Sequence, residues 1–184
     1  MDTYIKDAIC KILEQNQGLL KIPLRQRAKF EGWLKFELAH YLAEDGYKDV
    51  GVELKIPSNR ASNIRADISF CKDDIMYYVE LKTPNTNWRI EGINNSIRPI
   101  TKNIDSISAD VDKLKSLDSN SKGIVAFVLF PIPVKSNNYL DYIKRVSGEN
   151  HLTSSYNFNL LEFDIDDYNK CNMLICSFFA SKTD

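Results

Sequence analysis

The sequence predicts an α/β fold in which helices flank a central mixed β-sheet. Residues 123–130 form a continuous apolar run, which is typical of a strand buried on both faces. Residues 97–114 carry apolar side chains at alternating intervals of three and four, which predicts an amphipathic helix packed on the sheet. Residues 48–56 and 64–82 alternate between apolar and polar side chains as strands do. The predicted order is therefore helix, three strands, helix, strand.

The N-terminal part of the chain is predicted to be helical. Apolar side chains recur at helical spacing over residues 3–15, and again from about residue 25 to residue 45. Gly46 ends the second helix. A turn through Gly18 and Pro23 is expected to separate the two helices.

Three consecutive strands are predicted after these helices. Residues 48–56 form the first, and residues 64–82 form two more around a tight turn. Residues 84–95 are rich in Asn and Thr, which indicates a loop.

The C-terminal part is predicted to hold a short helix near residues 137–147 and a β-hairpin with strands near 156–165 and 172–180. No repeat, linker or low-complexity segment divides the chain. Residues 1–184 are therefore expected to form a single domain.

The second and third strands have a register that their side chains define. If Asp73 and Asp74 form the turn, Lys72 pairs with Ile75, and one face of the hairpin is wholly apolar. Its pairs are Phe70 with Tyr77, Ile68 with Val79, and Ala66 with Leu81. A slip of one residue would place apolar side chains opposite polar ones along the hairpin, so the pattern itself selects this register.

The other face of the hairpin carries charge. Asp67 is predicted to lie directly opposite Glu80, with Lys82 following on the same face. Two carboxylates in this relation are about 5 Å apart at Cβ and destabilise the sheet unless something neutralises them. A divalent cation with oxygen ligands would do so, and the combination suits phosphodiester hydrolysis. The alternative is a solvated hairpin whose charges keep an exposed face soluble.

The pattern of Asp67, a twelve-residue gap and Glu80-Leu81-Lys82 resembles the PD-(D/E)xK nuclease superfamily, although Ala66 stands where that family usually has proline. The resemblance implies a restriction-endonuclease-like core of order α-β-β-β-α-β over about residues 28–134. It also implies that Asp67 and Glu80 hold Mg²⁺, with Mn²⁺ as a substitute. The Leu81 carbonyl would be a further ligand, and Lys82 would be the catalytic lysine that positions or activates water.

As a function, the resemblance implies a metal-dependent endonuclease that acts on DNA in preference to RNA, and it is compatible with a homodimer. The alternative is a non-catalytic nucleic-acid-binding or assembly module that retains the nuclease fold. The intact set of Asp67, Glu80 and Lys82 favours the enzyme, because a decayed site usually loses at least one member.

Glu37 is a candidate for an additional catalytic carboxylate. It falls inside the apolar stripe of the second helix, where an ionised carboxylate is costly unless it is paired or bound to a metal. Several families with the resembled fold use a glutamate of the first core helix at the metal, and Glu31 is the fallback for this role. Alternatively, Glu37 lies at the edge of the stripe and pairs with Lys35, Lys82 or an arginine.

Nucleic-acid contacts are expected from the polar loop 57–63 and its neighbourhood. The candidates for phosphate contacts near this loop are Arg60, Asn63 and Arg65. Lys102, on the outer side of the helix predicted over residues 97–114, is a further candidate. An ordinary polar turn remains the alternative for the loop. Residues 83–89 form a second candidate substrate surface, in which Trp88 would stack on a base or cap the core. Basic side chains in the first part of the second helix are expected to form a solvated face or to contact the DNA backbone: Arg25, Arg27 and Lys29.

The amino-acid composition is compatible with a nuclease but does not by itself indicate one. The chain is 43% apolar and 27% charged, with a net charge of −1, and it has no run of eighteen apolar residues and no signal-peptide pattern. A cytoplasmic protein without a membrane partner is therefore expected. The four cysteines lack CxxC spacing, so reduced thiols are expected rather than a zinc site. Residues 21–65 carry nine Lys or Arg against six Asp or Glu, enough for a local basic face.

Overall fold

The structure of the chain is a computed structural model, which describes residues 1–56, 65–95, 100–150 and 157–180. These residues form helices and strands in the order α1 (Asp2–Gln15), α2 (Gln17–Gln26), α3 (Glu31–Glu44), β1 (Lys48–Val52), β2 (Ile68–Lys72), β3 (Ile75–Lys82), α4 (Ile100–Lys115), β4 (Ser121–Pro133), α5 (Tyr139–Asn150), β5 (Asn157–Asp164) and β6 (Lys170–Phe179). Within the described ranges, no helix has the length and apolar character needed to cross a membrane.

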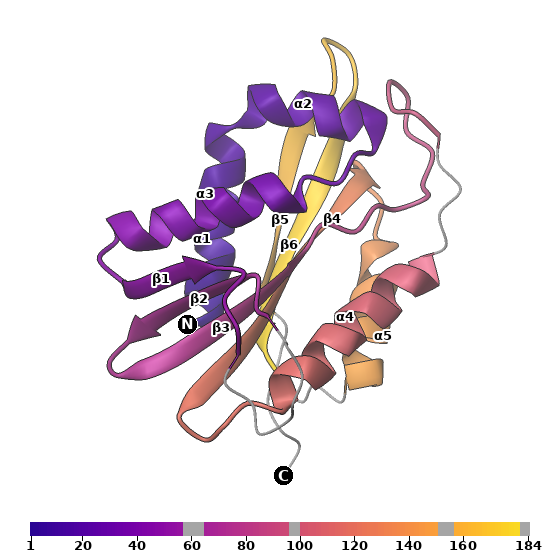
Figure 1. The fold of residues 1–184 in the computed structure, drawn as a ribbon. Coiled ribbons are helices and arrows are strands. Elements are labelled where there is room, and N and C mark those ends of the chain that lie inside the picture. The colour runs from indigo at the N-terminus through magenta and orange to yellow at the C-terminus, as the bar shows by residue number, and fades with distance from the viewer. Residues whose placement is uncertain (57–64, 96–99, 151–156, 181–184) are drawn as a thin grey trace.

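The six strands form one mixed sheet in the order β1-β2-β3-β4-β6-β5 (Figure 1). Strands β3 and β4 are parallel, and every other neighbouring pair is antiparallel. Helix α4 makes the crossover that a parallel pair requires. The expected α/β fold, with three strands, a helix, a buried strand and a C-terminal hairpin, is confirmed at this level.

Helices cover both faces of the sheet (Figure 1). Helices α1 and α3 pack on one face in a first apolar cluster, and α4 and α5 pack on the other in a second. Strand β4 supplies both clusters: Ile124, Ala126, Val128 and Phe130 belong to the first, and Val125, Phe127 and Leu129 to the second. The continuous apolar run of β4 therefore reflects burial on both faces, as predicted.

The N-terminal helices differ from the prediction. Gly18 and Pro23 lie inside α2 rather than in a turn, and the predicted long helix begins only at Glu31. Helix α2 ends at Gln26, because the next residue, Arg27, has a left-handed φ of 51° that stops a helix. Burial of Leu20 and Leu24 against the core outweighs the poor helix propensity of glycine and proline here.

Arg27 is buried, at 3% exposure, which corrects the expectation of a solvated basic face. Its guanidinium donates hydrogen bonds to the carbonyl oxygens of Asn94, Thr86 and Trp88. A buried charge is tolerated when its donors are satisfied in this way. Arg27 thus ties the end of α2 to the segment after β3.

The segment after β3 is buried and hydrogen-bonded to β4, and it is not an exposed loop. Residues 83–86 are buried, and Thr86 N–H donates to the Phe130 carbonyl at 2.8 Å. The Phe130 N–H in turn donates to the Pro84 carbonyl at 3.1 Å. The first half of the predicted substrate surface 83–89 is therefore not accessible, and Trp88 packs against the second apolar cluster.

Candidate active site

The hairpin register is the one that the sequence predicts, from Lys72–Ile75 to Ile68–Val79. Asp73 and Asp74 have φ values of 51° and 58° and so form the left-handed two-residue turn typical of tight hairpins.

Strand β2 departs from β3 at Asp67. The residues before it pair with the chain that follows β1: Ala66 N–H donates to the Leu54 carbonyl at 3.0 Å, and Glu53 N–H to the Asp67 carbonyl at 3.2 Å. The Asp67 side chain takes the place of the missing main-chain partner, because its Oδ2 accepts a hydrogen bond from Leu81 N–H at 2.8 Å. A carboxylate therefore stands where the β2–β3 ladder ends.

This departure corrects two predicted pairs. Asp67 is bonded to the Leu81 amide rather than lying in the ladder directly opposite Glu80. Ala66 packs in the second apolar cluster, whereas Leu81 belongs to the first, so these two do not share a face. Asp67 nevertheless remains close enough to Glu80 for its negative charge to act on that carboxyl.

Glu80 is a buried carboxyl, only 3% exposed. Burial raises its pKa to about 7, with a further contribution from the charge of Asp67, although Lys113 opposes the shift. Lys113 Nζ on α4 lies 2.5 Å from Glu80 Oε1. This contact is a close ion pair, which supplies the buried Oε1 with a positive charge.

Lys82 lies between two further carboxylates. Its Nζ is 3.1 Å from Asp110 Oδ2 on α4 and 3.8 Å from Glu31 Oε1 at the start of α3. Burial by itself lowers the pKa of Lys82, but Asp110 and Glu31 outweigh it and raise the pKa overall. Glu31 is also anchored by the Thr83 N–H, which donates to its Oε2 at 3.2 Å. Two helices thus converge on the end of β3 and hold a protonated lysine.

A third lysine, Lys35 on α3, contacts Asp67 at 2.8 Å and also pairs with Glu53. Its pKa is raised to about 12, because these two carboxylates outweigh the lowering effect of burial. Each of three carboxylates therefore faces its own lysine: Asp67 faces Lys35, Glu80 faces Lys113, and Asp110 faces Lys82.

Lys35 was expected only as a possible partner of Glu37, and Asp110 and Lys113 were not predicted to belong to the site. A signal for them exists in helical spacing, because Glu31 and Lys35 are four residues apart and Asp110 and Lys113 are three apart. Each pair therefore lies on one face of its helix. Which strand that face meets depends on tertiary packing, which spacing alone does not give.

Glu37 does not join this group. Each residue turns a helix by about 100°, so Glu37 lies about 160° around α3 from Lys35, on nearly the opposite side. Glu37 is half-buried, and its predicted partners Lys35 and Lys82 pair with other carboxylates. The fallback residue, Glu31, occupies the position beside Lys82.

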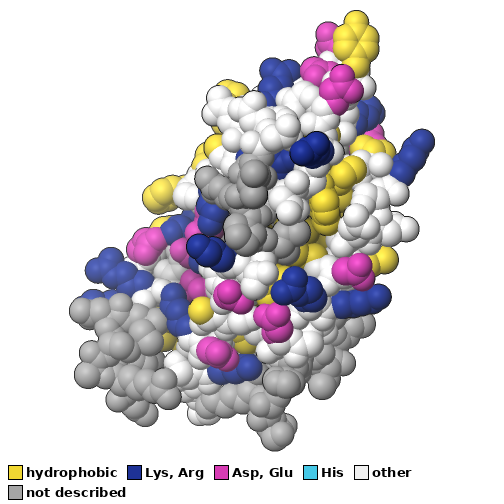
Figure 2. All heavy atoms as spheres, turned by 90° about the vertical axis from the view of Figure 1, so that its right-hand side faces the viewer, with side chains coloured by type: hydrophobic (Ala, Val, Ile, Leu, Met, Phe, Trp, Pro, Cys, Tyr) yellow, Lys and Arg dark blue, Asp and Glu magenta, His cyan; other side chains and the backbone are white. Residues whose placement is uncertain are grey.

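The predicted nucleic-acid contacts are described only in part. Arg60 and Asn63 lie outside the described residues. Arg65 is exposed two residues before Asp67, and Lys102 is exposed on α4, about 12 Å along the helix axis from Asp110. Figure 2 shows basic and acidic side chains interspersed on the side of the molecule that carries α4 and α5.

The carboxylates partly meet the requirements of a divalent cation. No group of three or more His, Cys, Asp and Glu side chains suited to a metal occurs in the part of the chain that the structure describes. Asp67 and Glu80 would therefore need a main-chain ligand. The Leu81 N–H points towards Asp67, and in a strand the carbonyl of the same residue faces the same way. Glu80 Oε1 and Asp110 Oδ2 are buried and each already meets a lysine ammonium, so a cation on either oxygen would have to take the place of that ammonium.

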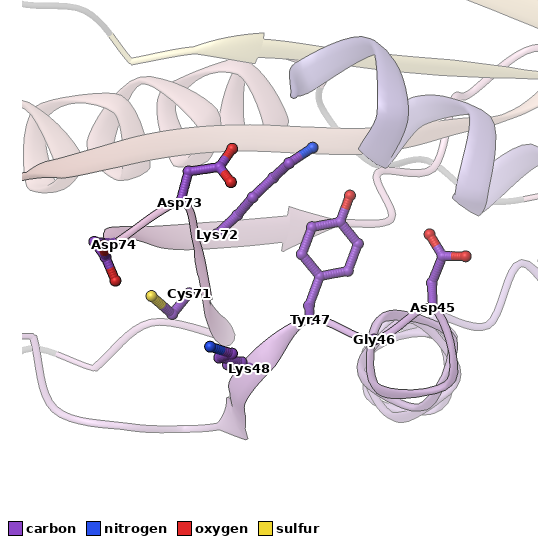
Figure 3. A pocket seen from close by; sticks show the side chains of 8 residues that line it. All are labelled: Asp45, Gly46, Tyr47, Lys48, Cys71, Lys72, Asp73 and Asp74. Atoms are coloured by element: carbon purple, nitrogen blue, oxygen red, sulfur yellow. The ribbon is translucent and has the colours of Figure 1, made fainter.

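A cavity at the turn end of the hairpin is separate from this group. Its volume is about 460 Å³ (Figure 3). In it the Lys72 ammonium lies 5.5 Å from the ring centroid of Tyr47, a cation–π contact. Its lining includes Asp45, Cys71, Asp73 and Asp74 but none of the residues around Lys82.

Comparison of the chain with models of protein families, with curated proteins and with solved structures finds no match. An account of function therefore rests on the geometry of these residues.

Proposed function

We propose that the protein is a Mg²⁺-dependent nuclease that hydrolyses phosphodiester bonds in DNA, with a restriction-endonuclease-like core. The observation that carries the proposal is that Asp67 bonds to the Leu81 amide, between Glu80 and Lys82, and lies close enough for its charge to act on both of these side chains. The order α-β-β-β-α-β from α3 to β4 is also the one that the nuclease resemblance implies.

In this proposal Asp67, Glu80 and the Leu81 carbonyl hold Mg²⁺, for which Mn²⁺ would substitute. A bound divalent cation would polarise the phosphate and lower the pKa of a coordinated water. The burial of Glu80 supports this role, because a buried carboxylate is costly unless it meets a positive charge, which Lys113 or a bound cation would supply.

Lys82 acts as a fixed cation and hydrogen-bond donor. Asp110 and Glu31 keep its ammonium in place and raise its pKa, so it stays protonated at neutral pH. It therefore offsets negative charge that develops on the phosphate and orients the attacking water, rather than removing a proton from it. Asp110 and Glu31 are positioning residues in this scheme.

Arg65 supplies a phosphate contact near the reacting bond, because it is exposed two residues from Asp67. The preference for DNA over RNA follows from the resemblance alone.

A non-catalytic nucleic-acid-binding or assembly module is the second candidate. The observation in its favour is that Asp67, Glu80 and Asp110 each pair with a lysine. Carboxylates neutralised in this way need no cation for stability.

The two candidates are separated by incubating supercoiled and linear DNA with Mg²⁺ or Mn²⁺ and with EDTA. We expect cleavage only with a divalent cation, and loss of most activity in Lys82→Ala. Lys72→Ala is the matched control, because Lys72 lies at the other end of the same hairpin. Wild-type protein that is inactive on varied DNA substrates with both metals would favour the module, and an undiminished Lys82→Ala would remove Lys82 from the mechanism.

A further inference from the structure

We infer that Lys113 is an internal counter-ion of Glu80 which an incoming divalent cation must displace, so that Lys113 sets the affinity of the site for metal. The inference rests on the proposed cation site, and it adds a residue that determines how tightly a cation binds there.

The contact between the two side chains is the first step. Lys113 Nζ lies 2.5 Å from Glu80 Oε1, and Glu80 is 3% exposed. Mg²⁺ binds oxygen at about 2.1 Å and demands near-ideal geometry. An ammonium already against Oε1 occupies the space that a cation on that oxygen would take, so the two cannot contact it together.

Electrostatics leads to the same conclusion. An ammonium and a divalent cation on one buried oxygen would repel each other at short range, in surroundings that screen charge poorly. Binding of a cation at Oε1 therefore requires Lys113 to move. Its side chain is 24% exposed, which gives its flexible stem a path to solvent.

Lys82 is different, because two carboxylates hold it. Its ammonium contacts both Asp110 and Glu31, whereas the only ion pair of Lys113 among the described residues is with Glu80. When a cation neutralises Glu80, Lys113 loses its partner but Lys82 keeps both of its own. The structure thus separates a displaceable lysine on α4 from a fixed lysine on β3.

The test measures metal binding rather than activity. Mn²⁺ binding to wild-type protein and Lys113→Met is followed by the loss of the free-Mn²⁺ spin-resonance signal. Lys115→Met is the matched control, because it removes one charge from the same helix while its partner is Asp112. We expect Kd for Mn²⁺ to fall about tenfold in Lys113→Met and to change by less than about twofold in Lys115→Met. An equal effect in both variants, or unchanged or weaker binding in Lys113→Met, would overturn the inference.

Folding of the variants is checked by their melting curves in EDTA. If Lys113→Met does not fold, Lys113→Gln replaces it, with the same tightening expected and the same contrary results. Absence of Mn²⁺ binding in wild type and both Lys113 variants would also overturn the inference. DNA cleavage by wild type is measured separately: tightened Mn²⁺ binding without cleavage would leave the counter-ion role intact and reject the nuclease.

Discussion

Two glutamates of α3 show how the position of one residue decides its role. Sequence reasoning favours Glu37 because it falls within the apolar stripe, and the structure places Glu31 beside Lys82 instead. The stripe locates the buried face of α3 correctly, since Leu34, Leu38 and Leu42 are buried. It does not show that the first turn of the helix lies over the end of β3, because that contact depends on where α2 ends.

Glu31→Gln is expected to lower DNA cleavage by about tenfold or more, because Lys82 loses one of the two charges that position it. Glu37→Gln should leave cleavage unchanged and alter stability by less than about 0.5 kcal/mol, as for most surface substitutions. Steady-state cleavage rates and urea unfolding of both variants give these values. Loss of cleavage in a fully folded Glu37→Gln, with Glu31→Gln unaffected, would reverse the assignment.

At the scale of elements, the hairpin divides into a part that the sequence predicts and a part that it does not. Alternation of apolar and polar side chains predicts the register from Lys72–Ile75 to Ile68–Val79 correctly. Beyond that pair, Ala66 and Asp67 bond to the backbone of Leu54 and Glu53 instead of continuing the ladder. Competition between two backbone partners leaves no side-chain pattern in the sequence, so the departure of β2 could not be predicted.

Arg27 joins α2 to the segment after β3, and its removal tests that connection. Arg27→Met leaves three carbonyl groups, one in a buried and two in partly buried hydrogen bonds, without their donor, so we expect a loss of about 2–4 kcal/mol in the free energy of unfolding. Lys29→Met, at an exposed position two residues on, should change it by less than about 0.5 kcal/mol. Urea unfolding measures both. Equal stability of the two variants would mean that the hydrogen bonds of the buried guanidinium to the segment after β3 contribute nothing to the free energy of unfolding.

For the molecule as a whole, the order of strands and helices follows from periodicity, and the α/β layers were predicted correctly. The break between α2 and α3 was not, because the left-handed Arg27 is held by carbonyl groups about sixty residues further along the chain. The three lysine–carboxylate contacts likewise join α3, the β1–β2 region, β3 and α4. They become visible only when these elements pack together.

The reactivity of the four cysteine thiols tests this packing. Cys10, Cys171 and Cys176 are buried, and burial raises the pKa of all three thiols, to about 12 for Cys171 and Cys176. Cys71 is half-buried and lines the cavity at the hairpin turn (Figure 3). A disulfide reagent at pH 8 should therefore modify one thiol quickly and the other three only on unfolding, since the thiolate is the reactive form. Two or more fast thiols in native protein, or a fast phase that persists in Cys71→Ser, would contradict this packing.

The central claim is that Asp67 and Glu80 share a divalent cation, and the stabilisation of the protein by Mg²⁺ tests it most directly. Wild type should gain about 1.4 kcal/mol in the free energy of unfolding at a Mg²⁺ concentration ten times Kd. Asp67→Asn should lose about 1–2 kcal/mol in EDTA, because Lys35 and the Leu81 amide lose a charged partner, and should then gain little from Mg²⁺.

Asp74→Asn is the control for this measurement, because Asp74 lies in the hairpin turn at a left-handed φ that asparagine also accepts. Unfolding curves of the three proteins in EDTA and in Mg²⁺ should show the same Mg²⁺ gain for wild type and Asp74→Asn. A gain in Asp67→Asn equal to that of wild type, or no gain in wild type at any Mg²⁺ concentration, would contradict a shared cation at Asp67 and Glu80.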